Sequence, residues 1–541
     1  MPSVRAAKSS ASKLRNKWIR WSWAGGRLGV LFFTPYCSDA PPAETTTPSS
    51  AQPPNGRELA AAYCANCHLY PEPKLLDRTT WRDYILPRMG ALLGIYRDGY
   101  GYYARVPDHW LAPGPGGQRI LTANIYPPEP LLSRPEWEAI ADYYLAEAPE
   151  QLESASADLE ISVGIPFMKA RTFAEGNVLP PLIQGMGVDE AQKRIYVSVF
   201  EEGIWQFDFR GRLLDRSETS ALVPSFTVDQ AHFALVDMGT RLASDHPQGS
   251  LQIASSWSAY RAGRSQQLPD LMRPVHLRRG DLNGDQRPDY LVCEYGNMLG
   301  RLAWWEAKAD GSFQAHNLYP DDGAIRTEIV DYDGDGDPDV LALQANSDEG
   351  IDLYLNEGQG QFERQRLLRF LSTNGSTHFE SLDFEGDGQL DLLVCNGDNG
   401  DYPPILKPHH GIRLYQRQGE RYQERFFLPL NGVYQATARD FDLDGDLDIA
   451  AVSFHPDFER HPQESFVLFI QEAPYEFRAF TIPQYGYSRW MRLQCFDWDA
   501  DGDPDLLLSA FNAKTPDVPE RRARDWEMTG EALLLLENTT R

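Results

Sequence analysis

The pattern of apolar and polar residues changes character near residue 180. Before this point, residues 56–63 and 79–89 carry apolar side chains at helical spacing, and a capping box at Ser133–Glu136 opens another such stretch. Beyond it, short apolar runs of strand length alternate with clusters of Asp and Gly. The pattern predicts a small all-α domain over residues 56–150 and an all-β domain after it.

The stretch that follows the capping box has one clearly apolar face. At helical spacing this face carries Trp137, Ile140, Ala141, Tyr144 and Leu145. The segment before it, residues 94–130, is rich in Gly, Pro and Tyr, and we expect it to be a long loop.

The all-β region is built from repeats. Five copies of an Asp-rich segment begin at Asp281, Asp331, Asp383, Asp440 and Asp497, and each runs into an apolar strand. Two fainter copies are anchored on Asp189 and Asp237. A period of about 50 residues with several short strands per unit is typical of a β-propeller. Seven copies predict seven blades.

Each strong repeat places oxygen-bearing side chains at positions 1, 3, 5 and 9. They are Asp281, Asn283, Asp285 and Asp289; Asp331, Asp333, Asp335 and Asp339; Asp383, Glu385, Asp387 and Asp391; Asp440, Asp442, Asp444 and Asp448; and Asp497, Asp499, Asp501 and Asp505. Oxygen-only ligands in a flexible loop favour Ca²⁺, so the sequence predicts up to five calcium ions. Position 12 is apolar in every copy, which excludes an EF-hand. The alternative is a set of hydrogen-bonded Asp turns without metal. The two fainter repeats lack these carboxylates, and we expect them to bind no ion.

This loop pattern resembles the FG-GAP (VCBS-type) repeats of integrin α-chain propellers and of many secreted bacterial proteins. The resemblance extends from about residue 180 to the C-terminus, and residues 353–362 match the strand-and-turn portion of such repeats. It implies a calcium-stabilised propeller over residues 180–541, with residues 151–179 as a connector.

The α-helical region contains the segment Cys64-Ala65-Asn66-Cys67-His68. In a Cys-x-x-Cys-His motif two thiols bind the vinyl groups of one haem, and the histidine then lies beside the iron as an axial ligand. A zinc site would need four ligands, and residues 56–150 contain no further cysteine. The motif therefore predicts one covalent haem c on Cys64, Cys67 and His68.

The second axial ligand follows by elimination. Within residues 56–150 the only methionine is Met89, and the only other histidine is His109. Met89 ends a short helical stretch, whereas His109 lies in the expected loop. A Met/His pair leaves no open position on the iron and suits electron transfer, so we assign Met89. The alternative for Met89 is packing in the core.

Composition and charge limit the classes of molecule that the protein can bind. The chain has 541 residues, with 78 Asp and Glu against 51 Lys and Arg, and a formal charge of −27. Nucleic-acid binding needs a basic surface, so this class of partner is excluded. The six cysteines are too few for a disulfide scaffold. We expect Cys293, Cys395 and Cys495, which lie in apolar runs, to be isolated buried thiols.

Residues 1–36 resemble an export signal with a long basic start and a short apolar stretch. No apolar run is long enough for a transmembrane helix. Cys37 follows and is a candidate lipid anchor, although the residues before it make a poor lipidation signal. Residues 37–55 are rich in Pro, Ser and Thr and read as a linker.

Alignment of the repeat anchors reveals one more polar set. Five residues before the anchors, the polar residues taken as a candidate channel site are His232, His276, Arg326, His378, Gln435 and Arg492. Alternation with apolar neighbours places them on one face of one strand per blade. If that strand is innermost, they line the channel and suit an anionic or polyhydroxyl ligand. The alternative is a solvated channel wall.

The whole arrangement resembles secreted bacterial proteins that join a cytochrome c domain to FG-GAP repeats. The resemblance implies electron transfer and metal binding. We expect an electron-transfer protein of the periplasm or cell surface that exchanges electrons with a redox protein or a small electron donor, and whose propeller binds the redox partner or an extracellular glycan. An alternative is a propeller dehydrogenase that oxidises a sugar or alcohol and passes the electrons to the haem. This alternative rests on fold analogy. A glycan lyase is a third reading, which leaves the haem unexplained.

Overall fold

The fold is described from a computed structural model. It covers residues 55–96, 115–173, 180–219, 221–240, 244–400 and 404–541. The chain divides into two compact units, residues 1–52 and 53–541, and all described residues belong to the second. The expected export signal, Cys37 and His109 lie outside the described residues, as does all of the linker except Asn55.

All three predicted helical stretches are helical. The elements are α1 (Gly56–Cys64), η1 (Pro73–Leu75), α2 (Arg78–Thr80), the π-helical turn η2 (Trp81–Ile85), α3 (Leu86–Leu92), α5 (Pro115–Ala123) and α6 (Arg134–Glu147). The expectation of a loop over residues 94–130 is wrong for α5. The Pro-Gly-Gly start of this helix concealed it, because proline is tolerated in the first turn while glycine disfavours helix.

Local chemistry fixes the two helices that pack together. The Asn55 side chain caps α1, and the predicted capping box at α6 forms, with Ser133 N donating to Glu136 Oε2 at 2.7 Å. At Gly56 the helices approach so closely that a Cβ would lie 2.1 Å from the carbonyl oxygen of Ala139. Only glycine fits there. The helices share a core that contains Trp137 and Tyr144.

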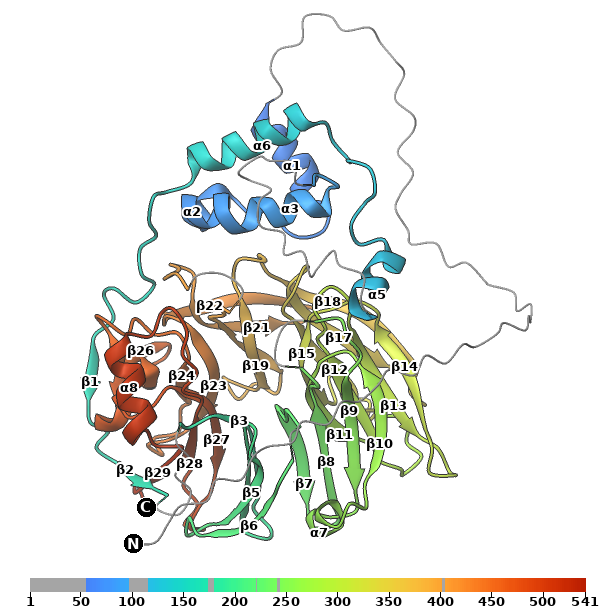
Figure 1. The fold of residues 1–541 in the computed structure, drawn as a ribbon. Helices are drawn as coiled ribbons and strands as arrows, with labels where there is room; N and C mark the ends of the chain where they lie inside the picture. Colours follow the sequence, from blue (N-terminus) through green and yellow to red (C-terminus); the bar gives the residue numbers. More distant parts are fainter. Residues whose placement is uncertain (1–54, 97–114, 174–179, 220, 241–243, 401–403) are drawn as a thin grey trace, which may run out of the picture. The chain divides into compact units, whose positions relative to one another are not determined.

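The remaining elements form seven sheets around an axis, each with four antiparallel strands (Figure 1). In chain order the blades are β3 (Ile183–Asp189) to β6 (Leu213–Ser217), β7 (Ser225–Asp229) to β10 (Gln266–Leu271), β11 (Pro274–Gly280) to β14 (Phe313–Tyr319), β15 (Ala324–Val330) to β18 (Phe362–Arg369), β19 (Ser376–Leu382) to β22 (Arg421–Pro429), β23 (Val433–Arg439) to β26 (Glu476–Thr481), and β27 (Trp490–Phe496) to β29 (Leu533–Asn538). We number them blades 1 to 7. The seven-bladed propeller predicted from the repeats is confirmed.

The middle strands and the short helices complete these sheets. The middle strands are β4 (Arg194–Val199), β5 (Gly203–Asp208), β8 (His232–Asp237), β9 (Gly249–Ala254), β12 (Asp289–Glu294), β13 (Arg301–Ala307), β16 (Asp339–Gln344), β17 (Gly350–Asn356), β20 (Asp391–Asn396), β21 (Gly411–Gln418), β24 (Asp448–Ser453), β25 (Phe466–Ala473) and β28 (Asp505–Ala510). The helices among the blades are α7 (Trp257–Arg261), η4 (Pro462–Ser465), η5 (Pro483–Gly486) and α8 (Glu520–Thr529).

The segment expected to be a connector supplies two strands. β1 (Ile161–Val163) adds in parallel to β26 as a fifth strand of blade 6. β2 (Met168–Thr172) pairs with β29 as the outer strand of blade 7, so this blade combines both ends of the propeller region. Both strands are short and contain no fully buried residue, which explains why the apolar pattern did not reveal them.

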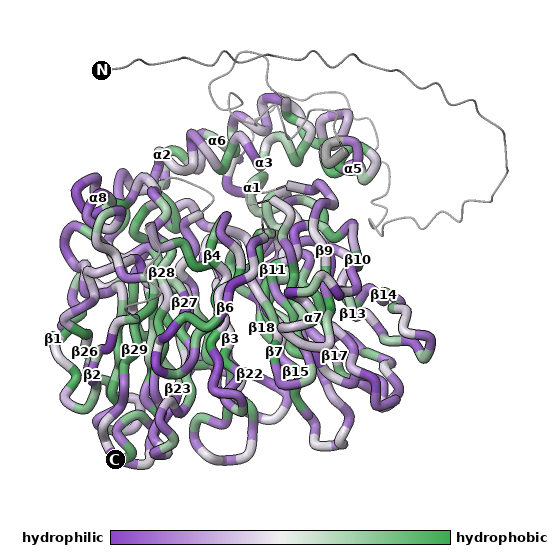
Figure 2. Tube along the Cα trace, turned by 60° about the horizontal axis from the view of Figure 1, so that its bottom comes forward, coloured by the Kyte–Doolittle hydropathy of each residue, from purple (hydrophilic) through white to green (hydrophobic). Residues whose placement is uncertain are grey.

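The seven first strands contact one another in cyclic order, from β3 through β7, β11, β15, β19 and β23 to β27 and back to β3. They are the inner strands of the propeller. The second and third strands of the blades are apolar and pack against neighbouring blades, whereas the loops are hydrophilic (Figure 2). Among the described residues no helix is long and apolar enough to cross a membrane.

The repeats map onto the blades with one exception. Asp189 ends the inner strand β3, as the repeat anchors predict, but Asp237 ends β8, the second strand of blade 2. The apolar run before Asp237 resembles the run before the other anchors, so the pattern predicts an inner strand there. The true inner strand β7 is short and mostly half-buried, and it ends at Asp229.

Candidate cofactor and cation sites

The Cys-x-x-Cys-His segment lies at the end of α1. Cys64 is the last residue of the helix and is partly buried against the core of the helical region, whereas Cys67 is exposed in the following turn. Burial raises the pKa of the Cys64 thiol to about 11. The two thiols therefore stand at the margin of an apolar core, one facing in and one facing out.

The histidine of the segment has a defined ring orientation. Its Nδ1 lies 2.8 Å from the carbonyl oxygen of Leu69, the geometry in which Nδ1–H donates and Nε2 carries the free lone pair. Metal-bound histidines are commonly oriented in this way by a carbonyl acceptor. Met89 lies in α3 and, like Cys64, is partly buried against the same core. The structure thus brings the thiol of Cys64 and the thioether of Met89 to one apolar core.

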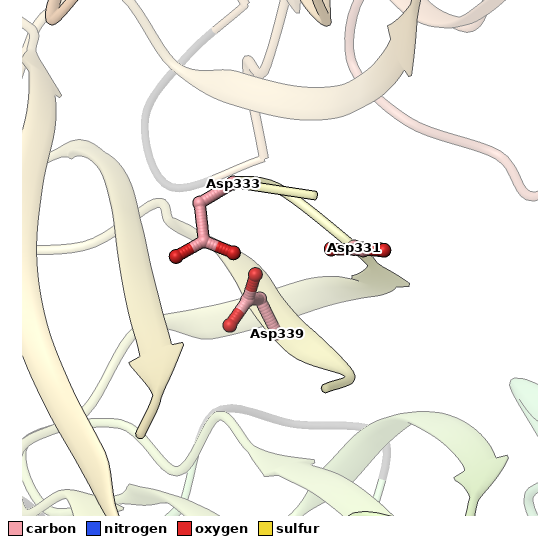
Figure 3. Close-up of side chains that lie close together, drawn as sticks. All are labelled: Asp331, Asp333 and Asp339. Carbon is pink, nitrogen blue, oxygen red and sulfur yellow. The ribbon is translucent and has the colours of Figure 1, made fainter. Parts of the chain in front are cut away.

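The Asp-rich loops join the inner strand to the second strand in blades 3 to 7. In blades 4, 6 and 7, carboxylate oxygens from positions 1, 3 and 9 all lie within 4.8 Å of one another. Figure 3 shows this arrangement in blade 4, where Asp333 and Asp339 turn toward each other beside Asp331. Such a group of oxygens can coordinate a hard cation.

Position 9 has a second function in every loop. In blade 4 the carboxylate of Asp339 accepts hydrogen bonds from Tyr332 N at 2.8 Å and from Asn356 N, in the third strand, at 2.7 Å. The equivalent pairs of bonds are made by Asp289, Asp391, Asp448 and Asp505. The residue at position 9 therefore ties its loop to the sheet.

Burial raises the pKa of these position-9 carboxyls. The pKa reaches about 7 in Asp391, Asp448 and Asp505, where neighbouring carboxylates add to the effect of burial. A cation in the loop would oppose both causes by stabilising the charged form.

Position 5 lies outside the three-carboxylate groups. In blade 4, Asp335 Oδ1 accepts a hydrogen bond from Asp337 N at 2.8 Å, so this carboxylate closes the turn. Position 7, which the predicted ligand set does not include, is occupied by Asp337, Asp446 and Asp503 in blades 4, 6 and 7. One buried oxygen of Asp446 and one of Asp503 have no hydrogen-bond partner among the described residues. Unpaired buried carboxylate oxygens fit cation ligation.

The loops of blades 3 and 5 are less acidic. In blade 3 position 3 is the amide of Asn283, and position 7 is Arg287, whose guanidinium forms an ion pair with Asp285. In blade 5 position 3 is Glu385, which accepts a hydrogen bond from Tyr475 Oη at 2.5 Å. These two loops carry three and four carboxylates, against five in each of the other three.

The candidate channel residues divide in the structure. His276, Arg326, His378, Gln435 and Arg492 lie on the inner strands of blades 3 to 7. The assignment of His232 to this set is wrong, because it begins β8, the second strand of blade 2. There it is buried and stacks on Tyr290, with the ring centroids 5.7 Å apart.

One buried charged cluster was not foreseen. Arg489, which is 0% exposed, lies against the ring of Phe454, and its Nη2 is 3.3 Å from Asp517 Oδ2. Asp517 also contacts His455 Nδ1 at 2.8 Å. These residues come from long loops whose meeting has no periodic signal in the sequence.

Burial by itself would raise the pKa of Asp517. The hydrogen bond from His455 and the charge of Arg489 outweigh it, and the pKa falls to about 2. The cluster is therefore charged and internally paired.

Comparisons with known proteins agree with the repeats. The FG-GAP-like repeat family matches residues 281–342 and 331–394, and a comparison with curated proteins found no match. Similar solved structures include the RRP9 WD40 repeats (11% identity, TM-score 0.43, 70% of this chain and 100% of that one). A second is U3-55K, with 11% identity and a TM-score of 0.41 over 68% of this chain and 98% of that one. A third is the Neurospora crassa Pan2 WD40 domain, with 8% identity and a TM-score of 0.42 over 71% of this chain and 98% of that one. The chain carries FG-GAP-like repeats on a seven-bladed propeller, a fold that fits ligand or partner binding.

Proposed function

We propose that the protein is an extracytoplasmic electron-transfer protein with one covalent haem c, whose calcium-stabilised propeller binds a partner or ligand. The observation that carries the proposal is the Cys-x-x-Cys-His segment at the end of α1, at the margin of an apolar core. A bound haem c would supply reversible one-electron chemistry at iron.

The residues of the chain have distinct functions in this proposal. The thiols of Cys64 and Cys67 would hold the haem covalently, and His68 presents Nε2 because its Nδ1–H donates a hydrogen bond to the carbonyl oxygen of Leu69. Met89 would hold the iron through its thioether. A haem held by both His68 and Met89 would supply electron transfer without substrate binding.

The propeller contributes stability in the same proposal. Calcium ions occupy the Asp-rich loops, and the carboxylate groups of blades 4, 6 and 7 support this assignment. An ion bound only by the folded state raises the free energy of unfolding, by about 2.7 kcal/mol when its free concentration is 100 times its dissociation constant.

The test of the haem assignment is spectroscopy on protein made in a host that attaches haem c. We expect one haem per chain that survives denaturation, and its loss in Cys64→Ala and Cys67→Ala. Met89→Ala should change the reduction potential and the visible spectrum. Met528→Ala, at an exposed methionine of α8, should change neither. Purified chain without covalent haem would contradict the proposal.

The same protein distinguishes electron transfer from the dehydrogenase alternative. The oxidised haem is mixed with a panel of sugars and alcohols, with and without added quinone. Reduction of the haem by one of these substrates would favour a dehydrogenase. An unreduced haem that still exchanges electrons with small redox proteins would favour electron transfer in the periplasm or at the cell surface.

A further inference from the structure

The inner strands carry a ring of equivalent positions, one per blade. In blades 3 to 7 the pairing of the inner with the second strand shifts by one residue immediately before this position. Such a bulge changes the direction of the side chain that follows it, and bulges are frequent beside functional sites. We define the inner ring as Gly185, Ser225, His276, Arg326, His378, Gln435 and Arg492.

Four members of the inner ring connect their blade to the next one. Each bonds the backbone of the residue that follows the next ring position. Two of them accept a hydrogen bond from a backbone N–H: Ser225 Oγ from Leu277 N at 3.2 Å, and His276 Nδ1 from Thr327 N at 3.3 Å. The other two donate a hydrogen bond to a backbone carbonyl: Arg326 Nε to Phe379 O at 2.7 Å, and Gln435 Nε2 to Leu493 O at 2.9 Å. These contacts give the four side chains a structural function.

Two members of the inner ring break this pattern. His378 is only 4% exposed, yet neither of its ring nitrogens has a hydrogen-bond partner among the described residues. Arg492 Nε is likewise buried without such a partner, and the guanidinium lies over the ring of Tyr434 at 5.3 Å. Buried polar groups are nearly always paired, so these two need a partner that the described chain does not supply.

The charges around these groups are mostly positive. Burial, together with the charges of Arg326, Arg492 and Arg278, holds the pKa of His378 well below its usual range. The same three arginines and burial lower the pKa of His276. These residues occupy equivalent positions on inner strands that surround one axis, so Arg326, His378 and Arg492 border one central space.

Carboxylates balance this charge only in part. Glu328 lies 3.0 Å from Arg326, and Glu380 lies 2.8 Å from Arg439. Arg278 and Arg492 have no ion pair within the described chain. An anion would complete the pairing, and guanidinium groups bind planar or tetrahedral oxyanions well.

We propose that the inner ring binds one small oxyanion, a carboxylate or a sulfate or phosphate group, among Arg326, His378 and Arg492. The ligand accepts hydrogen bonds from the two guanidinium groups and from one nitrogen of the neutral imidazole. This site is independent of haem and calcium, and it assigns the propeller a small acidic ligand.

The test is calorimetric titration of the full-length protein, loaded with haem and calcium, with sodium sulfate and with sodium malonate in chloride buffer of matched ionic strength. We expect one saturable site for at least one of them, and the preferred anion identifies the tetrahedral or the carboxylate class. Arg492→Gln should weaken binding by about 10- to 100-fold, because it removes a charge-assisted hydrogen bond to the anion. It breaks no hydrogen bond of the described chain, so the variant should fold.

The control is Arg478→Gln, at a half-exposed arginine on β26, the fourth strand of blade 6, which should bind like the wild type. His378→Gln is a second variant that should weaken binding. Absence of saturable binding of both anions to the wild type would overturn the proposal. Equal weakening by R478Q and R492Q, or unchanged binding in R492Q, would overturn it as well.

Discussion

At the scale of single residues, two kinds of buried charge in this propeller have defined partners. Asp339 and its four equivalents each accept two backbone hydrogen bonds, and Arg489 is enclosed by Asp517, Phe454 and backbone carbonyls. A buried charge that loses its partner keeps the cost of its desolvation. Residues of this kind should therefore be much more sensitive to substitution than exposed ones.

The clearest case is Asp517→Asn. It leaves Arg489 charged, buried and without its carboxylate, so we expect the free energy of unfolding to fall by about 3–5 kcal/mol. Urea denaturation at pH 7 measures this. Asp525→Asn, at an exposed aspartate of α8, should change stability by less than about 0.5 kcal/mol. Equal effects of the two variants would show that the cluster contributes nothing specific.

The burial of Glu349 should make the free energy of unfolding depend on pH. This carboxyl is 3% exposed, and burial raises its pKa to about 7, although Ser376 donates two hydrogen bonds to it. Between about pH 4.5 and 7 the unfolded chain has lost a proton that the folded protein retains. The contribution of Glu349 to stability is therefore full below pH 4.5 and is lost as the pH rises to 7.

Glu349→Gln removes this titration. Between pH 5 and pH 8 the free energy of unfolding of the wild type should fall by about 3 kcal/mol more than that of the variant. Glu357→Gln, at an exposed glutamate, should follow the wild type. Parallel curves for all three proteins would mean that Glu349 is charged in the folded state at pH 5.

At the scale of elements, the strands and loops that recur in every strong repeat were predictable from the sequence, whereas the elements outside these repeats were not. The Asp-rich loops fix the start of the second strand in blades 3 to 7, because position 9 must be buried there. Blades 1 and 2 lack that constraint, and the anchor Asp237 was placed on the wrong strand. Helix α5 was missed because its first turn contains Pro115, Gly116 and Gly117.

The loops should form two classes of calcium site. Blades 4, 6 and 7 offer five aspartates each, whereas Arg287 in blade 3 and Gln389 in blade 5 replace the acid at position 7. Because affinity rises with ligand charge, we expect three tight and two weaker sites in a titration against a calcium chelator. EGTA should lower the melting temperature.

A matched pair of variants assigns these classes. Asp440→Asn should remove one tight site, and Asp383→Asn should remove one weak site, since both change position 1 of a loop. A titration with identical sites would contradict the division into two classes. A melting temperature unaffected by EGTA would contradict the calcium assignment for these loops.

At the scale of the whole molecule, the sequence predicted the number of blades but not how the ring closes. The period of about 50 residues counts seven units without any knowledge of which strands pair. Closure depends on β2, five residues of mixed polarity that precede blade 1 and pair with β29. A short edge strand has neither a clear alternation nor a turn signal, so its partner is visible only in three dimensions.

Proline substitutions at two neighbouring positions of β2 should differ in their effect on stability. Lys169 pairs with Glu537, and Ala170 pairs with Leu536, in an antiparallel ladder whose outer edge is β2. Successive N–H groups of a strand point in opposite directions, so only one of these two faces β29. Of Lys169→Pro and Ala170→Pro, one should therefore lose a ladder hydrogen bond and be less stable than the other by about 1–3 kcal/mol.

The outer strand of blade 2 provides the comparison. Gln266→Pro and Gln267→Pro disturb β10, which pairs with β9 of the same continuous blade. Loss of β10 frays one blade, whereas loss of β2 separates the two ends of the propeller, so the more harmful β2 variant should lower the melting temperature further than either β10 variant. A closed ring unfolds as one cooperative unit. The variant that opens the ring should therefore also broaden the thermal transition. Similar melting in all four variants would indicate that the ring stays closed without β2, through contacts of β27 with β3.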